Sequence, residues 1–159
     1  AFLKLSIAVS ILTEALQLHF VNKGYGEGAI LGISVEVTNH VKNQTYLLTP
    51  IAEVDAPKLI QNMGRLHGTN IISPFLAFPL GSKQVVSKWY AFVWEDKHSK
   101  YAQTHLEAGL FTFDIYVKTD RPNGPQKYLT FTHTFSQDAI NSFMSGNAIY
   151  NLKSSAFAN

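Results

Sequence analysis

The sequence has no cysteine among its 159 residues. A chain without cysteine forms no disulfide, offers no thiolate to a metal ion and has no cysteine nucleophile. The absence leaves the redox compartment open. The length is that of one domain, and it is sufficient for a sizeable apolar core.

Charged residues are also sparse. They make up 15% of the chain, and 13 Lys and Arg against 11 Asp and Glu leave a formal net charge of +2. A nucleic-acid binder concentrates positive charge on one face, and no Lys-rich or Arg-rich cluster occurs here. The composition therefore excludes a strongly electrostatic nucleic-acid binder.

The short motifs of catalysis and metal binding are missing as well. The chain has no G-x-S-x-G elbow, no phosphate-binding loop and no dinucleotide fingerprint, and its six histidines lack the H-x-x-x-H spacing of zinc sites. His98 and His105 lie near three acidic residues, so a metal site assembled in space competes with the interpretation as solvated loop histidines. We expect no enzyme, no cofactor and no metal.

Residues 1–20 carry the most informative pattern. Read at 3.6 residues per turn, the polar side chains fall on one narrow stripe made of Ser6, Ser10, Thr13, Glu14 and Gln17. The rest of the cylinder is apolar and includes Phe2, Leu5, Val9, Leu12 and Leu16. This apolar surface is wider than one contact with a globular core requires, and 18 helical residues span about 27 Å, close to the hydrocarbon thickness of a bilayer.

We therefore predict an amphipathic, membrane-inserting N-terminal helix whose polar stripe faces water, in a pore lumen or at a membrane surface. Three alternatives compete with it. The segment also fits a buried core or oligomer helix, and its early Lys4 fits a secretory signal peptide. A transmembrane anchor is disfavoured, because Glu14 would lie well inside the span.

The period changes after a glycine-rich stretch at residues 22–28, which we predict to be a hinge or a simple loop. Residues 33–38 and 44–49 alternate as a hairpin across a turn at 39–43. Further strands are predicted at 84–94, 109–118, 128–135 and 148–152, with a short helix or loop at 137–144. This pattern predicts one domain over residues 1–159, with an antiparallel β-sandwich at 29–159.

Aromatic residues reach 13% of the chain and gather after residue 88. Trp and Tyr combine an apolar body with a polar tip, which suits membrane interfaces, lipid headgroups and sugars. Trp89, Tyr90, Trp94 and Tyr101 are thus candidates for a headgroup or glycan site, although the two tryptophans also fit a sandwich core. Asn43-Gln44-Thr45 is a glycosylation sequon by pattern, a triplet that also arises often by chance.

Several segments resemble the actinoporins, a family of pore-forming toxins. The segments occur in the family's order at residues 11–16, 29–39, 109–115 and 128–136. The resemblance implies a secreted β-sandwich that docks on target-cell membranes and releases its helix to build an oligomeric pore. In the family a phosphocholine site follows the last of these strands. There this chain keeps Ser136 and places Phe143 where the family has Tyr, but it lacks the family's proline.

Three functions follow from these observations. The first is a membrane-binding, pore-forming protein with lipid partners of unknown species and a homo-oligomer on the membrane. The second is a lectin-like or other ligand-binding module, for which a glycan is the possible partner. The third is a structural or assembly protein that uses residues 1–20 as an interface.

Overall fold

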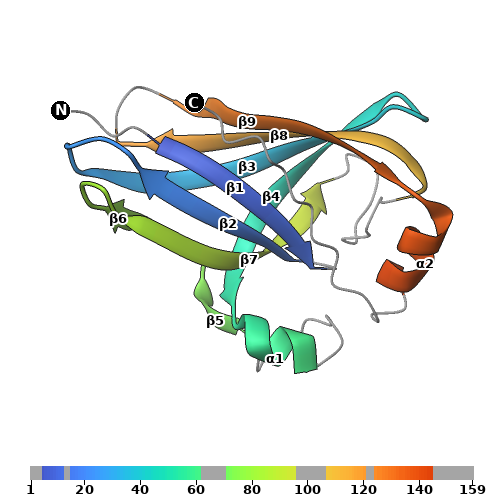
Figure 1. The fold of residues 1–159 in the computed structure, drawn as a ribbon, viewed down its shortest axis with the longest axis horizontal. Helices are drawn as coiled ribbons and strands as arrows, with labels where there is room; N and C mark the ends of the chain where they lie inside the picture. The colour runs from blue at the N-terminus through green and yellow to red at the C-terminus, as the bar shows by residue number, and fades with distance from the viewer. Residues whose placement is uncertain (1–4, 13–14, 62–70, 96–106, 121–123, 145–159) are drawn as a thin grey trace.

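The computed structural model describes residues 5–12, 15–61, 71–95, 107–120 and 124–144 (Figure 1). In chain order the elements are β1 (Leu5–Leu12), β2 (Ala15–Asn22), β3 (Gly28–Asn39), β4 (Gln44–Val54), α1 (Ala56–Gln61), β5 (Ile71–Pro74), β6 (Phe78–Leu80), β7 (Val85–Glu95), β8 (Gly109–Thr119), β9 (Gln126–Phe135) and α2 (Gln137–Met144). Every strand pairing among the described residues is antiparallel. The mainly β, antiparallel class predicted from the sequence is confirmed.

The N-terminal segment is a β-hairpin, and the predicted helix over residues 1–20 is wrong. β1 and β2 pair along their whole length. The sequence of β2 alternates with period two, and β-branched residues of β1 such as Ile7 and Ile11 suit a pleated surface. The spacing of Ser6 and Ser10 is consistent with a helix and with a strand, because residues four apart lie on the same side of either element.

The residues assigned to that helix consequently have other roles. Of the five expected to insert into a membrane, Leu5 and Leu16 are buried, with 9% and 3% of their surfaces exposed. Val9 and Leu12 lie in β1, and Phe2 lies outside the described residues. Of the polar stripe, Ser6 and Ser10 lie in β1, Gln17 lies in β2 opposite Ser10, and Thr13 and Glu14 lie outside the described residues.

All strands of the described residues belong to one sheet. Their order is β1-β2-β7-β4-β3-β8-β9, with β5 added beside β4 and β6 beside β3. The sheet curls strongly, so that β1 at one end contacts β9 at the other without pairing with it (Figure 1). The sandwich predicted from the sequence consists of two separate sheets, whereas these strands form one sheet whose ends fold toward each other.

Two long strands change partners and divide the sheet into wings. β3 pairs with β6 near its start and with β4 near its end. β7 pairs with β2 over its first half and with β4 over its second half. The first wing is thus β1, β2 and the start of β7, and the second wing is β6, β3, β8 and β9. Between the wings, β6 continues beside β3 while β7 continues beside β2. We call the place where these two strands separate the fork.

One apolar core fills the space between the two wings. Alternate residues of each strand enter it, among them Leu18 and Phe20 from the first wing and Val35 and Phe113 from the second. The rings of Phe20 and Phe78 meet edge to face across the wings, with centroids 5.2 Å apart. The inner side of the hairpin is therefore part of the domain's own core.

The loop over residues 22–28, predicted as a hinge, is tied to the turn between β6 and β7. Buried Asn22 donates from Nδ2 to the carbonyl oxygens of Gly26 at 2.8 Å and Gly81 at 3.0 Å. Its Oδ1 accepts the Gly24 N–H at 2.9 Å. Since the same side chain joins three backbone segments, the loop anchors β2 in this structure.

The remaining predictions match the described residues closely. The β3–β4 hairpin, β7, β8, β9 and α2 all form within a few residues of the expected limits. β4 extends past the predicted end to Val54, because a bulge next to Pro50 lets the strand continue without the missing N–H. The strand predicted at 148–152 lies outside the described residues.

Candidate functional site

The structure does not bring the predicted ligand residues together. Trp89 lies half-buried in β7, and Tyr90, the next residue, is 1% exposed inside the core. Ser136 lies between β9 and α2, immediately before the helix, and its Oγ accepts the Ala139 N–H at 3.1 Å. Trp94 and Phe143 lie in β7 and α2, but the structure does not describe their side chains, and Tyr101 lies outside the described residues. Of the predicted ligand residues, Trp89 and Ser136 have described, accessible side chains, and they lie on different elements of the fold.

Trp89 belongs to the outer face of the first wing. Because Leu16, Leu18 and Tyr90 point into the core, the alternating pleat turns the residues between them outward. Gln17 is the direct register partner of Trp89, and His19 is the partner of Ser87. We call these four residues, Gln17, His19, Ser87 and Trp89, the tryptophan platform.

Polar groups surround the indole on this platform. His19 Nδ1 and Ser87 Oγ lie 2.6 Å apart, which fixes the imidazole against β7. The indole N–H of Trp89 makes no hydrogen bond within the described part of the chain. The platform thus offers one aromatic surface, one free donor, an amide and a paired hydroxyl.

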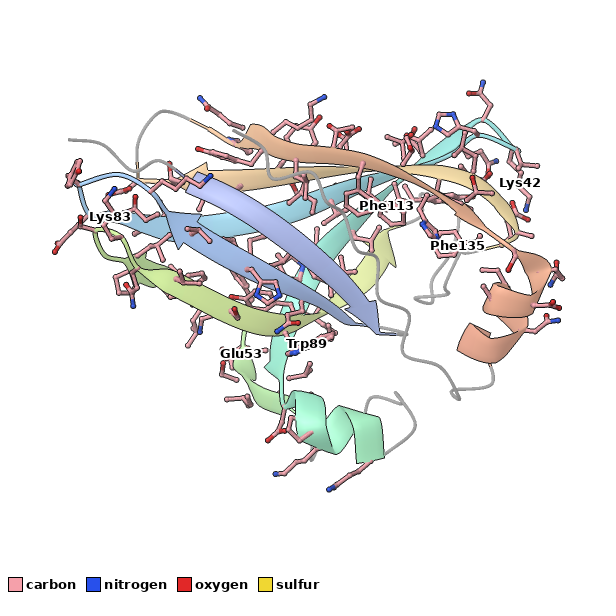
Figure 2. The ribbon with its side chains drawn as sticks, in the orientation of Figure 1. Lys42, Glu53, Lys83, Trp89, Phe113 and Phe135 are labelled. Carbon is pink, nitrogen blue, oxygen red and sulfur yellow. The ribbon has the colours of Figure 1, made fainter. Side chains whose placement is uncertain are left out.

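A different group of polar residues meets at the fork, where Glu53 of β4 faces Lys88 and Tyr90 of β7. We call these three residues the fork cluster. Lys88 Nζ donates to Glu53 Oε1 at 2.8 Å, with 27% and 16% of the two side chains exposed. The ammonium also lies 4.9 Å from the centre of the Phe78 ring. Lys88 therefore links β7 to both β4 and β6 where the sheet divides. Glu53 of this cluster is labelled in Figure 2.

Tyr90 Oη is buried at this cluster and has no hydrogen-bond partner among the described residues. Burial raises the pKa of Tyr90 well above its ordinary value of 10.0, and the nearby Glu53 carboxylate raises it further. The phenol therefore stays protonated and is neither a base nor a nucleophile. The cluster offers hydrogen bonding and charge balance, but no activated group.

The described ranges hold neither a metal site nor a membrane-spanning helix. No set of three His, Asp or Glu residues is placed there to hold a metal ion. His98 and His105, the pair considered for a metal, lie outside those ranges. Among the helices that the structure describes, none has the length and apolar character needed to cross a membrane.

Comparison with known proteins adds no relative. No family model, no curated protein and no solved structure matches this chain.

The sequence analysis identified some of these residues and missed others. Trp89 and Gln17 were singled out, but for unrelated reasons, and only the β2–β7 register makes them neighbours. His19, Glu53 and Lys88 were missed. The alternation of apolar and polar residues over 15–22 predicts that His19 lies on the outer face of a strand. The contact between β4 and β7 cannot be predicted from the sequence.

Proposed function

We propose that the protein is a non-catalytic binding module that holds a sugar ring on the tryptophan platform. The observation that carries the proposal is the half-buried Trp89, whose indole N–H makes no hydrogen bond to the described residues and whose neighbours are polar. A pyranose ring has an apolar face of C–H groups, which packs on an aromatic surface, and a rim of hydroxyls, which needs donors and acceptors. The platform supplies both kinds of group side by side.

The position of the platform suits recognition of an exposed sugar. Gln17 offers an amide donor and acceptor beside the indole, and Ser87 offers a hydroxyl one row away. These side chains project from paired strands rather than from long loops, so the platform is ordered before the ligand arrives. Because the platform makes only a small number of contacts, we expect modest affinity for a single sugar and tighter binding to multivalent glycans.

Burial of the hairpin is the reason for preferring this function over helix-driven pore formation. The pore hypothesis needs a segment that leaves the body, but β1 and β2 contribute five side chains to the core: Leu5, Ile7, Leu16, Leu18 and Phe20. Their burial is worth about 8 to 15 kcal/mol in total. That is as large as the ~5–15 kcal/mol stability of a whole domain. Removing the hairpin would therefore unfold the protein.

The broader expectations remain predictions. Membrane binding, a homo-oligomer on a membrane, secretion and the resemblance to actinoporins are compatible with a curled β domain but are not required by it. The inner side chains of the hairpin cannot form an interface with another subunit, because the core of the same chain already covers them. This removes the basis for an assembly role through that face.

A glycan screen with the full chain tests the proposal. Purified protein is applied to an array of natural oligosaccharides, and hits are measured by calorimetry. We expect Trp89→Ala to weaken binding at least tenfold, which corresponds to about 1.4 kcal/mol. Trp89→Phe should retain part of the affinity because it keeps an aromatic surface. Tyr25→Ala is the matched control, since Tyr25 is 81% exposed in a loop away from the platform.

Two results would contradict the proposal. The first is glycan binding that Trp89→Ala leaves unchanged, which would move the site elsewhere. The second is an absence of glycan hits together with sedimentation on liposomes of phosphatidylcholine and sphingomyelin. That outcome would favour the membrane-binding hypothesis, and dye release from the same liposomes would then test for a pore.

A further inference from the structure

The turn between β3 and β4 contains two asparagines that differ in what they do. Asn39, at the start of the turn, is 1% exposed, and its Oδ1 accepts the N–H groups of Val41 at 2.9 Å and Lys42 at 3.2 Å. Its Nδ2 donates to Glu107. Asn39 therefore supplies the side-chain hydrogen bonds that shape the turn.

Asn43, at the other end of the turn, is exposed. Its side-chain amide makes no hydrogen bond in the part of the chain that the structure describes. Its backbone has φ of 51°, a left-handed conformation that asparagine tolerates better than most residues. The conformation accounts for an asparagine there, but it leaves the amide nitrogen unused and open to solvent.

The residues after Asn43 complete an acceptor sequence for N-linked sugars. Gln44 is not proline, and Thr45 supplies the hydroxyl residue two positions on. This is the only Asn-x-Ser/Thr triplet in the chain. Thr45 is the second residue of β4, and its Oγ1 lies 3.1 Å from Thr38 Oγ1 on the outer face. We propose that Asn43 is a site of N-linked glycosylation when the chain passes through a eukaryotic secretory pathway.

The reaction is a group transfer from a lipid-pyrophosphate-linked oligosaccharide. A bond forms between Asn43 Nδ2 and the anomeric carbon of the donor, and the bond from that carbon to the pyrophosphate oxygen breaks. Nδ2 loses one proton, and the lipid pyrophosphate leaves. The protein supplies only the acceptor, because the transferring enzyme of the pathway provides the catalysis.

The fold accepts a glycan at this position. The turn residues His40, Val41 and Lys42 are exposed like Asn43, and Val41 keeps 65% of its surface accessible. Lys42 marks the turn at one extremity of the molecule, well separated from Trp89 (Figure 2). A glycan at Asn43 therefore covers an apolar side chain on the turn and leaves the tryptophan platform open. Glycosylation of Asn43 does not depend on which ligand binds the tryptophan platform.

Secretion of the full chain from eukaryotic cells behind a cleavable leader tests the proposal. Thr45→Val removes the acceptor sequence but keeps a branched side chain in β4, and Thr45→Ser retains the sequence. We expect the wild type and Thr45→Ser to carry a glycan, and Thr45→Val to carry none. Peptide N-glycosidase should remove the mass of the glycan and leave Asp in place of Asn at position 43.

The structure adds a second readout. Because Asn43 is exposed at the tip of a turn, the glycosidase should release the sugar from the native protein without denaturant. Equal masses for secreted wild type and Thr45→Val would overturn the proposal, as would a glycan that resists release until the protein is unfolded. Matching thermal unfolding of unglycosylated Thr45→Val and Thr45→Ser made in bacteria excludes misfolding as the cause of a lost glycan.

Discussion

The two faces of the β2–β7 ladder use neighbouring residues for opposite purposes. On the inner face, Leu18 and Tyr90 are at most 1% exposed and pack in the core. On the outer face, Gln17, His19 and Trp89 remain partly accessible and display polar groups around one indole. Because the pleat alternates strictly, moving one position along either strand changes a residue from stabilising the domain to forming its surface.

The largest expected difference between the faces is in stability. Phe20→Ala should lower the free energy of unfolding by about 3–5 kcal/mol, since Phe20 is fully buried and contacts Phe78 across the wings. His19→Ala, one residue away on the outer face, should change it by less than about 1 kcal/mol. Urea denaturation of both variants measures the contrast. Equal losses would contradict the assignment of the two faces.

The second expected effect concerns the ion pair between Lys88 and Glu53 in the fork cluster, where the inner face is polar. Lys88→Ala leaves the Glu53 carboxylate largely buried without its ion partner, so we expect a loss of about 1–3 kcal/mol at neutral pH. The same substitution in a Glu53→Gln background should cost less, because no charge is left unpaired. A double-mutant cycle in urea gives the coupling. Additive losses would mean that the pair does not help to hold the fork.

A smaller effect of opposite sign is expected at Tyr90. Its hydroxyl is buried without a partner in the described residues, so Tyr90→Phe removes an unsatisfied polar group and keeps the ring. The variant should be as stable as the wild type, or more stable by up to about 1 kcal/mol. Thermal and urea unfolding measure the change. A clear destabilisation would show that the hydroxyl has a hydrogen-bond partner, such as a buried water.

The weakest effect should come from His133, which shares the inner face of β9 with buried Leu129 and Phe135. Burial lowers the pKa of His133 below its ordinary value of 6.5. The unfolded chain then binds more protons, so stability should fall as the pH drops below 6.5 and level off below the folded pKa. NMR titration of the imidazole gives the folded pKa. A midpoint above 6.5, or an unchanged slope in His133→Gln, would contradict this account.

The sequence predicted the strands that bury one face far better than it predicted the hairpin. In β8, Phe111, Phe113 and Ile115 alternate with polar residues, so the strand could be recognised at once. In β1 the positions between the core residues include the apolar Ala8 and Leu12. Both faces of the strand therefore carry apolar residues, and the period of two is hard to recognise. The platform could not be predicted, because it depends on pairing between β2 and β7, which are far apart in the chain.

Residue-resolved hydrogen exchange of the native protein tests most directly whether the N-terminal hairpin is a permanent part of the sheet. If it is, the ladder amides of β2 should be as strongly protected as those of β8, and both should exchange only through global unfolding. Exchange of β2 amides that is many times faster than that of β8 would mean that the hairpin opens by itself. That result would contradict the account and return the segment to a role in release and insertion.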